Sequence, residues 1–182
     1  MIAGGASFIQ LREKHASPRE FYDDAKKAIE IARPRGVRII INDRVDIARV
    51  LKADGVHLGQ DDMPPVAARS VLGEDAIIGF STHSIEQVLA AVQLPVDYVA
   101  FGPVFSTQTK KDPDPIVGLE LLRQVQQIVG EMLLVAIGGI TAENVRSVLD
   151  TGAESAAIIG AIVSDRDKIV ERTKGLLEIR KK

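Results

Sequence analysis

The sequence predicts an α/β fold of the (β/α)8 TIM-barrel type with seven strands visible, and three observations support this prediction. Seven short apolar segments alternate with amphipathic segments along the chain, which is typical of a parallel sheet covered by helices. The apolar segments are unbroken, as expected for strands buried on both faces. Polar or glycine motifs follow nearly every strand, whereas an open doubly wound sheet concentrates its binding residues at one switch point.

The predicted strands are short runs of isoleucine, valine, leucine and alanine bounded by glycine or polar residues. They cover residues 7–12, 38–41, 55–59, 76–80, 98–102, 132–137 and 156–159. Before the first strand, residues 1–6 resemble the end of a helix with a glycine stop. Residues 103–113 form the longest predicted loop, and its hydroxyl residues and two lysines favour a functional role.

The segments between the strands have apolar residues at helical spacing and recognisable ends. Ser17, Pro18 and Glu20 predict an N-cap, a first-turn proline and a capping-box acid. Pro34 and Gly36 end the helix that these residues begin. Further helices are predicted over residues 44–53, 64–72, 84–92, 119–129, 143–150 and 165–179.

A barrel of this type has eight strands, so one strand–helix unit at the front of the barrel has no counterpart in the sequence. No linker or shift in composition divides the chain, and residues 1–182 are expected to form a single barrel domain. An open barrel exposes strand edges, so we expect association into a homo-oligomer or low stability.

Composition excludes several classes of protein. A content of 46% apolar residues is ample for a core, and a net charge of −2 gives no global attraction to nucleic acid or membranes. The absence of cysteine excludes disulfides, thiolate catalysis and cysteine-ligated metals. No signal peptide or membrane-spanning apolar run is visible, so a cytoplasmic location is expected.

Two neighbouring strands are followed by acidic residues. The strand at 38–41 ends in Asn42-Asp43, and the strand at 55–59 ends in Gln60-Asp61-Asp62. Since active sites of such barrels lie at the carboxyl ends of the strands, Asp43 and Asp62 are candidate ligands for a hard cation that also binds phosphate oxygens. The alternative is that each acid caps the helix that follows it. Matching positions on two strands favour the metal.

Other strand ends carry groups suited to anions. Gln10, Arg12 and Lys14 lie on one side if the first strand continues, and the two cations would bind a diphosphate. Gly138-Gly139 and Gly160 follow the last two strands, whose loops frequently bind a phosphate in such barrels. His57 lies within a strand and is expected to be structural. His83 is a candidate acid–base group or a helix-start residue.

As a set, these motifs resemble those of the thiamine-phosphate synthase family. The matching segments begin at residue 10, end near residue 162 and follow the family's order. They are Gln10-Leu11-Arg12-Glu13-Lys14, Asn42-Asp43, residues 53–62, Gly102-Pro103-Val104-Phe105, Thr107-Gln108-Thr109-Lys110-Lys111 and Ala136-Ile137-Gly138-Gly139-Ile140.

The resemblance implies a magnesium-dependent transferase of thiamine biosynthesis, which joins a hydroxymethylpyrimidine diphosphate to a thiazole phosphate and releases pyrophosphate. Asp43 and Asp62 would bind the Mg²⁺ ion. The residues implied to bind the diphosphate are Arg12, Lys14, Asn42, Ser81 and Lys110. All of these except Asn42 are also expected to be catalytic. Gln10 would line the pyrimidine pocket. The residues implied to bind the thiazole phosphate are Thr107, Thr109, Gly139, Ile159 and Gly160.

The chain departs from the family pattern at Gly160, where the family commonly has a serine that contacts the thiazole phosphate. Two alternative functions remain open. One is the thiazole tautomerase of the same fold, which needs neither metal nor diphosphate and is disfavoured by Asp43 and Asp62. The other is a truncated, non-catalytic phosphate-binding protein, which would bind ligand without turnover.

Overall fold

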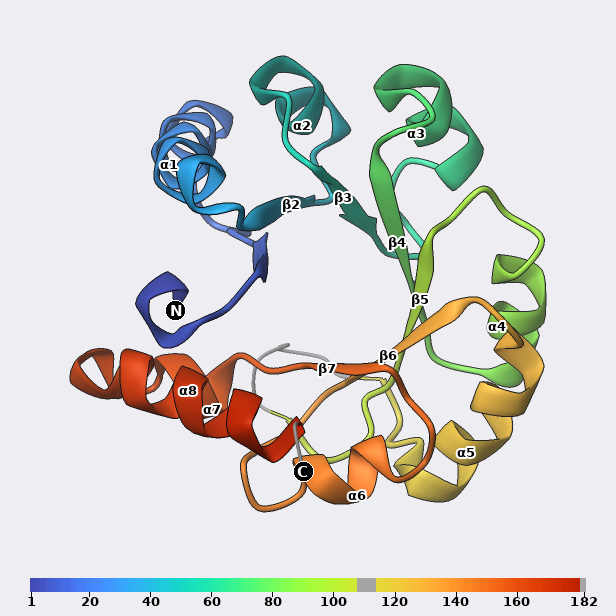
Figure 1. Ribbon diagram of the computed structural model, residues 1–182. Helices are drawn as coiled ribbons and strands as arrows, with labels where there is room; N and C mark the ends of the chain where they lie inside the picture. The colour runs from blue at the N-terminus through green and yellow to red at the C-terminus, as the bar shows by residue number, and fades with distance from the viewer. Residues whose placement is uncertain (108–113, 181–182) are drawn as a thin grey trace.

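Within the residues that the structure describes, the protein contains one parallel sheet of seven strands, each hydrogen-bonded to its sequence neighbour in the order β1 to β7 (Figure 1). The computed structural model describes residues 1–107 and 114–180. The strands are β1 (Phe8–Leu11), β2 (Arg38–Asn42), β3 (Gly55–Leu58), β4 (Ile77–Thr82), β5 (Tyr98–Phe101), β6 (Leu133–Ile137) and β7 (Ser155–Ala157). The seven strands expected from the sequence are therefore confirmed, although β7 ends two residues earlier than expected.

Helices connect the strands and lie around the outside of the sheet (Figure 1). The α-helices are α1 (Pro18–Ala32), α2 (Val45–Leu51), α3 (Pro65–Leu72), α4 (Ile85–Ala91), α5 (Gly118–Val129), α6 (Val145–Leu149), α7 (Gly160–Val163) and α8 (Ile169–Arg180). Three 3₁₀ turns are η1 (Ile2–Gly4), η2 (Arg33–Arg35) and η3 (Arg166–Lys168). The sequence did not predict α7, because its apolar residues continue the β7 pattern. In the described ranges, no helix has the length and apolar character needed to cross a membrane.

The capping box predicted for α1 is present. The Ser17 backbone N–H donates to Glu20 Oε2 at 2.8 Å, and the Glu20 N–H donates to Ser17 Oγ at 3.3 Å. Both bonds satisfy donors that a helix start leaves unpaired, so this helix begins where its sequence predicts.

The strands β2, β3 and β5 are buried on both faces for nearly their whole length. Ile39 and Ile41 of β2 pack in the main hydrophobic cluster with Phe21 and Ile29 of α1. Ile40 between them is completely buried on the opposite face of the sheet, because side chains alternate along a strand. For these strands the unbroken apolar runs in the sequence correspond to coverage on both sides, as expected, whereas β1, β6 and β7 are only partly covered.

Acidic residues at the amino ends of alternate strands bind the neighbouring strand. Each of three acids makes two hydrogen bonds with one residue of the neighbouring strand. The backbone N–H of the acid donates to the carbonyl of that residue, and the carboxylate of the acid accepts from its backbone N–H. The pairs are Asp54 with Ile39, Asp97 with Ile78, and Glu154 with Leu134, and each carboxylate bond is 2.7 Å. These bonds fix the register between β2 and β3, β4 and β5, and β6 and β7, far from the carboxyl ends of the strands.

The first and last segments of the fold meet through η1 and α8, which lie side by side in Figure 1. A side chain at Gly4 would lie 2.7 Å from both the Val170 oxygen and Thr173 Cβ, so the backbones approach as closely as glycine allows. In the described residues, the sheet pairings run from β1 to β7 and do not join these two strands to each other. The outer layer of helices thus curves around an open sheet.

Candidate active site

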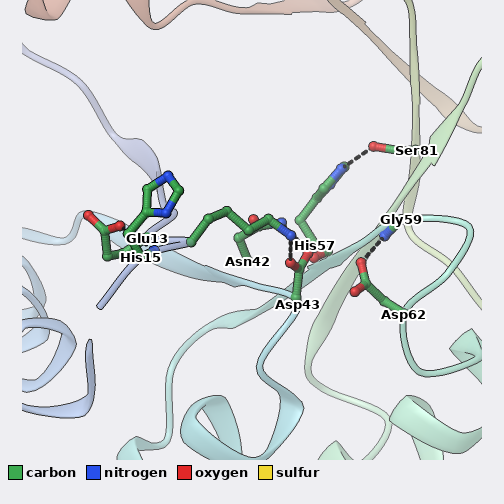
Figure 2. Close-up of polar contacts among 9 residues, drawn as sticks. Glu13, His15, Asn42, Asp43, His57, Gly59, Asp62 and Ser81 are labelled. Carbon is green, nitrogen blue, oxygen red and sulfur yellow. Dashed lines mark hydrogen bonds and ion pairs between the residues drawn. The ribbon is translucent and has the colours of Figure 1, made fainter. Parts of the chain in front are cut away.

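The carboxyl ends of β1 to β4 bring polar side chains from distant parts of the sequence together. Lys14 follows β1, Asn42 ends β2 with Asp43 next, Asp62 lies in the loop after β3, and Ser81 belongs to β4. Figure 2 shows Asp43 and Asp62 at neighbouring strand ends, with His57 pointing from β3 toward Ser81. Five residues that the sequence assigned to one site are therefore gathered at one edge of the sheet.

Asp43 is placed by a tight turn. Its φ of 62° is in the left-handed region, which aspartate and asparagine tolerate better than most residues. Its backbone N–H donates to the His57 carbonyl at 2.9 Å, and Asn42 Nδ2 donates to Asp43 Oδ1 at 2.6 Å. The turn thus continues the pairing of β2 with β3 and fixes the carboxylate beside Asn42.

Asp62 is placed by the loop that follows β3. The Gly59 backbone N–H donates to Asp62 Oδ2 at 2.7 Å, and the Asp62 N–H donates back to the Gly59 carbonyl at 3.3 Å. A side chain at Gly59 would lie 3.1 Å from that carboxylate oxygen. The loop therefore folds Asp62 back onto the end of its own strand, and the acid does not cap a helix.

Asp62 influences the ionisation of Asp43. Burial raises the pKa of Asp43, the ion pair with Lys14 lowers it, and the hydrogen bond and charge of Asp62 raise it again. The net direction is upward. A partly buried pair of acids that repel each other is suited to a cation. Within residues 1–107 and 114–180, no group of three or more acidic or histidine side chains is placed to bind a metal, so this site offers two protein carboxylates.

His57 is a buried residue of the site that the sequence analysis treated as structural. Its Nδ1 lies 2.9 Å from Tyr98 Oη and its Nε2 lies 2.7 Å from Ser81 Oγ. Burial lowers its pKa to about 4, so the ring is neutral near pH 7. Sequence reasoning missed Tyr98 altogether. Gly79, a glycine inside a strand, is the signal that a large group approaches there.

The loops after β5 and β6 pack on each other. Val104 N–H donates to the Ile137 carbonyl at 2.9 Å, and Phe105 N–H donates to the Gly138 carbonyl at 3.1 Å. Gly139 has a φ of 65°, and a side chain there would lie 2.4 Å from the Ser106 carbonyl oxygen. The close approach expected at Gly139 is therefore made by the chain's own 105–106 segment, which brings the partly buried Thr107 toward this end of the sheet.

The remaining predicted residues lie as follows. Gln10 is half-buried on β1, and Arg12 is exposed just beyond that strand. Ile159 precedes α7 and is exposed, and a side chain at Gly160 would meet nothing within 4 Å. Thr109 and Lys110 lie outside the described residues.

His83, the alternative acid–base candidate, lies at the end of β4. Its Nδ1 is 2.6 Å from the Gly102 carbonyl oxygen, and its Nε2 is 3.5 Å from Asp114 Oδ2. Both nitrogens thus contact groups of the loops around β5, and the Ser81 hydroxyl is contacted by His57 instead.

Comparison with known proteins gives one consistent result. A family model described as thiamine monophosphate synthase matches residues 1–162. The thiamine-phosphate synthase of Desulfitobacterium hafniense (strain Y51) is 43% identical over 178 residues, covering 98% of this chain and 85% of that protein. The thiamine-phosphate synthase of Syntrophomonas wolfei is 46% identical over 166 residues, covering 91% and 79%. The structure of thiamine phosphate pyrophosphorylase from Pyrococcus furiosus has a TM-score of 0.89 and 37% identity, covering 99% and 85%.

Proposed function

This chain belongs to the thiamine-phosphate synthase family, whose members are transferases of thiamine biosynthesis, and from that membership we propose how its residues perform the reaction. The substrates proposed are 4-amino-5-hydroxymethyl-2-methylpyrimidine diphosphate and thiazole phosphate, and the products are thiamine phosphate and pyrophosphate. The observation that carries this proposal is the pair of neighbouring carboxylates, Asp43 and Asp62, with the Lys14 ammonium group in contact with Asp43.

Mg²⁺ fits the donor set at this edge of the sheet. Magnesium is commonly bound through one or two carboxylates together with substrate phosphates and water, and two carboxylates are what Asp43 and Asp62 offer. We propose that these two residues bind the ion. When bound, it supplies positive charge opposite the diphosphate. The tautomerase alternative has no use for such a pair, so the pair favours the synthase.

The side chains around the acids are proposed to bind the diphosphate. Lys14 is within reach of Asp43, and Arg12, Asn42 and Ser81 come from the same strand ends; Lys110 completes the proposed set. As the carbon–oxygen bond to the diphosphate breaks, the electron pair leaves with pyrophosphate, and these cations and donors stabilise the growing negative charge. Gln10 is proposed to line the pyrimidine pocket.

The second substrate is proposed to bind at the loops after β5, β6 and β7. Its phosphate would be bound by Thr107, Thr109, Gly139 and the turn at Ile159-Gly160. The thiazole nitrogen then forms the new carbon–nitrogen bond with its lone pair, and no protein nucleophile is needed. The contribution of the protein to this step is to bring the two reacting atoms together in line.

We further propose that residues 1–182 form a single domain of the (β/α)8 barrel type, with the place of the eighth strand between β1 and β7. The contact of η1 with α8 supports this, because it shows how far the helix layer curves. A cytoplasmic location and a homo-oligomeric state stay predictions. Both are compatible with an enzyme that acts on small-molecule substrates.

The test is pyrophosphate release from the purified chain with both substrates and Mg²⁺, compared with its Asp62→Asn variant. We expect release that requires both substrates and Mg²⁺ and that falls at least about a hundredfold in the variant. Asp54→Asn is the matched control, because Asp54 precedes the same strand that Asp62 follows, and it should retain activity. Binding of both ligands without release from folded protein would contradict the proposal in favour of a binding-only protein.

A further inference from the structure

Tyr98, His57 and Ser81 form a hydrogen-bonded row that crosses three neighbouring strands. His57 on β3, Gly79 on β4 and Tyr98 on β5 are register partners at one level of the sheet. The Tyr98 ring extends over Gly79 and reaches His57 Nδ1 at 2.9 Å, and His57 Nε2 reaches Ser81 Oγ at 2.7 Å. Figure 2 shows the last of these contacts.

The arrangement depends on the missing side chain of Gly79. A Cβ atom at Gly79 would lie 2.0 Å from Tyr98 Cζ and 2.3 Å from its Oη, so no other residue leaves room for the ring. The ring stacks on His57 with centroids 5.5 Å apart, and Phe8 of β1 packs edge-on at 6.1 Å. Tyr98 and His57 are only 6% and 5% exposed, so four strands fix the ring in a buried position.

Two directions of hydrogen bonding are conceivable along this row, and they leave different protons without a partner. If Ser81 donates to His57 and His57 donates to Tyr98, the phenolic proton of Tyr98 needs another acceptor. Within the described residues, the hydrogen bond of Tyr98 Oη is the one to His57. A buried donor without an acceptor is costly, so this direction is disfavoured.

The opposite direction satisfies every buried group. Tyr98 donates to Nδ1, the neutral ring carries its proton on Nε2, and Nε2–H donates to Ser81 Oγ. The Ser81 proton is then directed away from the ring. Ser81 is half-buried at the carboxyl end of β4, so its proton can reach an anion at that edge.

We propose that His57 is a positioning residue, oriented by Tyr98, which donates to Ser81 Oγ and so leaves the Ser81 hydroxyl as a donor to the substrate diphosphate. The inference rests on the proposed function, in which Ser81 binds that diphosphate. It extends that function by explaining why the Ser81 hydroxyl donates its proton toward the diphosphate and not to His57.

The direction of the hydrogen bonds is tested in the protein without substrates by NMR. The chain has three histidines, and His57→Gln assigns the His57 ring signals in ¹⁵N-histidine-labelled protein. We expect a protonated Nε2 and an unprotonated Nδ1 in the wild type at pH 7. A proton on Nδ1 with none on Nε2, or a doubly protonated ring, would overturn the inference whatever the enzyme's activity.

The link to the diphosphate is tested by a double-mutant cycle of Tyr98→Phe and Ser81→Ala, because Tyr98→Phe removes one oxygen and keeps the ring. We expect Tyr98→Phe to reduce kcat/KM for the pyrimidine diphosphate and to leave KM for thiazole phosphate unchanged. In the Ser81→Ala background, which alone costs about ten- to a hundredfold, Tyr98→Phe should have no further effect. Additive effects, or equal effects on both substrates, would overturn the inference.

A second pair of variants addresses His57 itself. His57→Gln keeps a side-chain N–H near the Nε2 position, whereas His57→Leu keeps neither nitrogen. The glutamine variant should retain several times more kcat/KM than the leucine variant, with both folded by circular dichroism. Equal losses would contradict a role through Ser81. Wild-type protein that releases no pyrophosphate would contradict the proposed function, and the NMR result alone would then decide the direction of the row.

Discussion

Lys14 and Asp43, which follow adjacent strands, form an ion pair at the edge of the sheet where the sequence placed a diphosphate and a metal. The Lys14 side chain is 45% exposed and the Asp43 side chain 18%. The pair therefore offsets only part of the cost of burying Asp43, whose pKa is raised by burial and by Asp62. The charged form of Asp43 therefore lowers the stability of the folded protein, as expected for a functional acid.

Replacing Asp43 by asparagine should separate activity from stability. Asparagine has the same shape and tolerates the φ of 62°, and it removes the repulsion by Asp62. We expect the free energy of unfolding of the metal-free protein to stay equal or rise by up to about 1 kcal/mol, while Mg²⁺-dependent pyrophosphate release is lost. Urea titration and the release assay measure the two effects. A fall in stability of more than about 1 kcal/mol would show that the Lys14 pair dominates instead.

The buried His57 should make the protein sensitive to mild acid. Its pKa is lowered from 6.5 to about 4 in the folded state, so the unfolded chain binds the proton more readily. Stability from this group is complete above pH 6.5 and is lost as the pH falls toward 4, with about 2 kcal/mol lost between pH 7 and pH 5. Urea titrations at several pH values measure this loss. His57→Gln, which does not titrate, should lose markedly less over the same interval, and parallel curves for the two proteins would refute the prediction.

The glycine turns after β6 and β7 should respond oppositely to a side chain. Gly139→Ala introduces a contact of 2.4 Å at a φ of 65° and should cost more than about 2 kcal/mol in stability. In Gly160→Ser the new Cβ meets no atom within 4 Å, and the substitution introduces the hydroxyl that the family commonly has at this position. It should lower KM for thiazole phosphate about three- to tenfold with unchanged stability. Steady-state kinetics and thermal unfolding distinguish the outcomes, and an unchanged or higher KM would place that phosphate elsewhere.

The acids at the amino ends of the strands should affect stability alone. Asp54→Ala removes the acceptor for the Ile39 N–H and should cost about 1–2 kcal/mol. Asp54→Asn keeps an acceptor oxygen and should cost less. Both variants should retain the wild-type KM values, because Asp54 and the site lie at opposite ends of β3. A change in either KM at constant stability would contradict this separation of the two ends.

Most of the fold was predictable because its signals are local. The apolar runs, the helix caps at Ser17 and Glu20, and the acids that follow β2 and β3 occupy contiguous positions, and strand ends in such a fold share one edge. The same reasoning places Asp43 and Asp62 at one site, whereas Asn42 and Ser81 are assigned to the diphosphate by the resemblance to the family. Boundaries were weaker, as at β7 and α7, since isoleucine-rich residues suit a strand and a short helix equally.

What the sequence by itself determined is thus the order of the elements and the residue types at their ends. The tertiary structure decided which of these residues meet. Lys14 pairs with Asp43, which lies 29 positions further along the chain. Tyr98 crosses Gly79 to orient His57 toward Ser81, and Tyr98 and His57 are separated by 41 positions. Such contacts depend on the register of neighbouring strands and on space left by a missing side chain. Both are properties of packed backbones, which no single segment of the chain encodes.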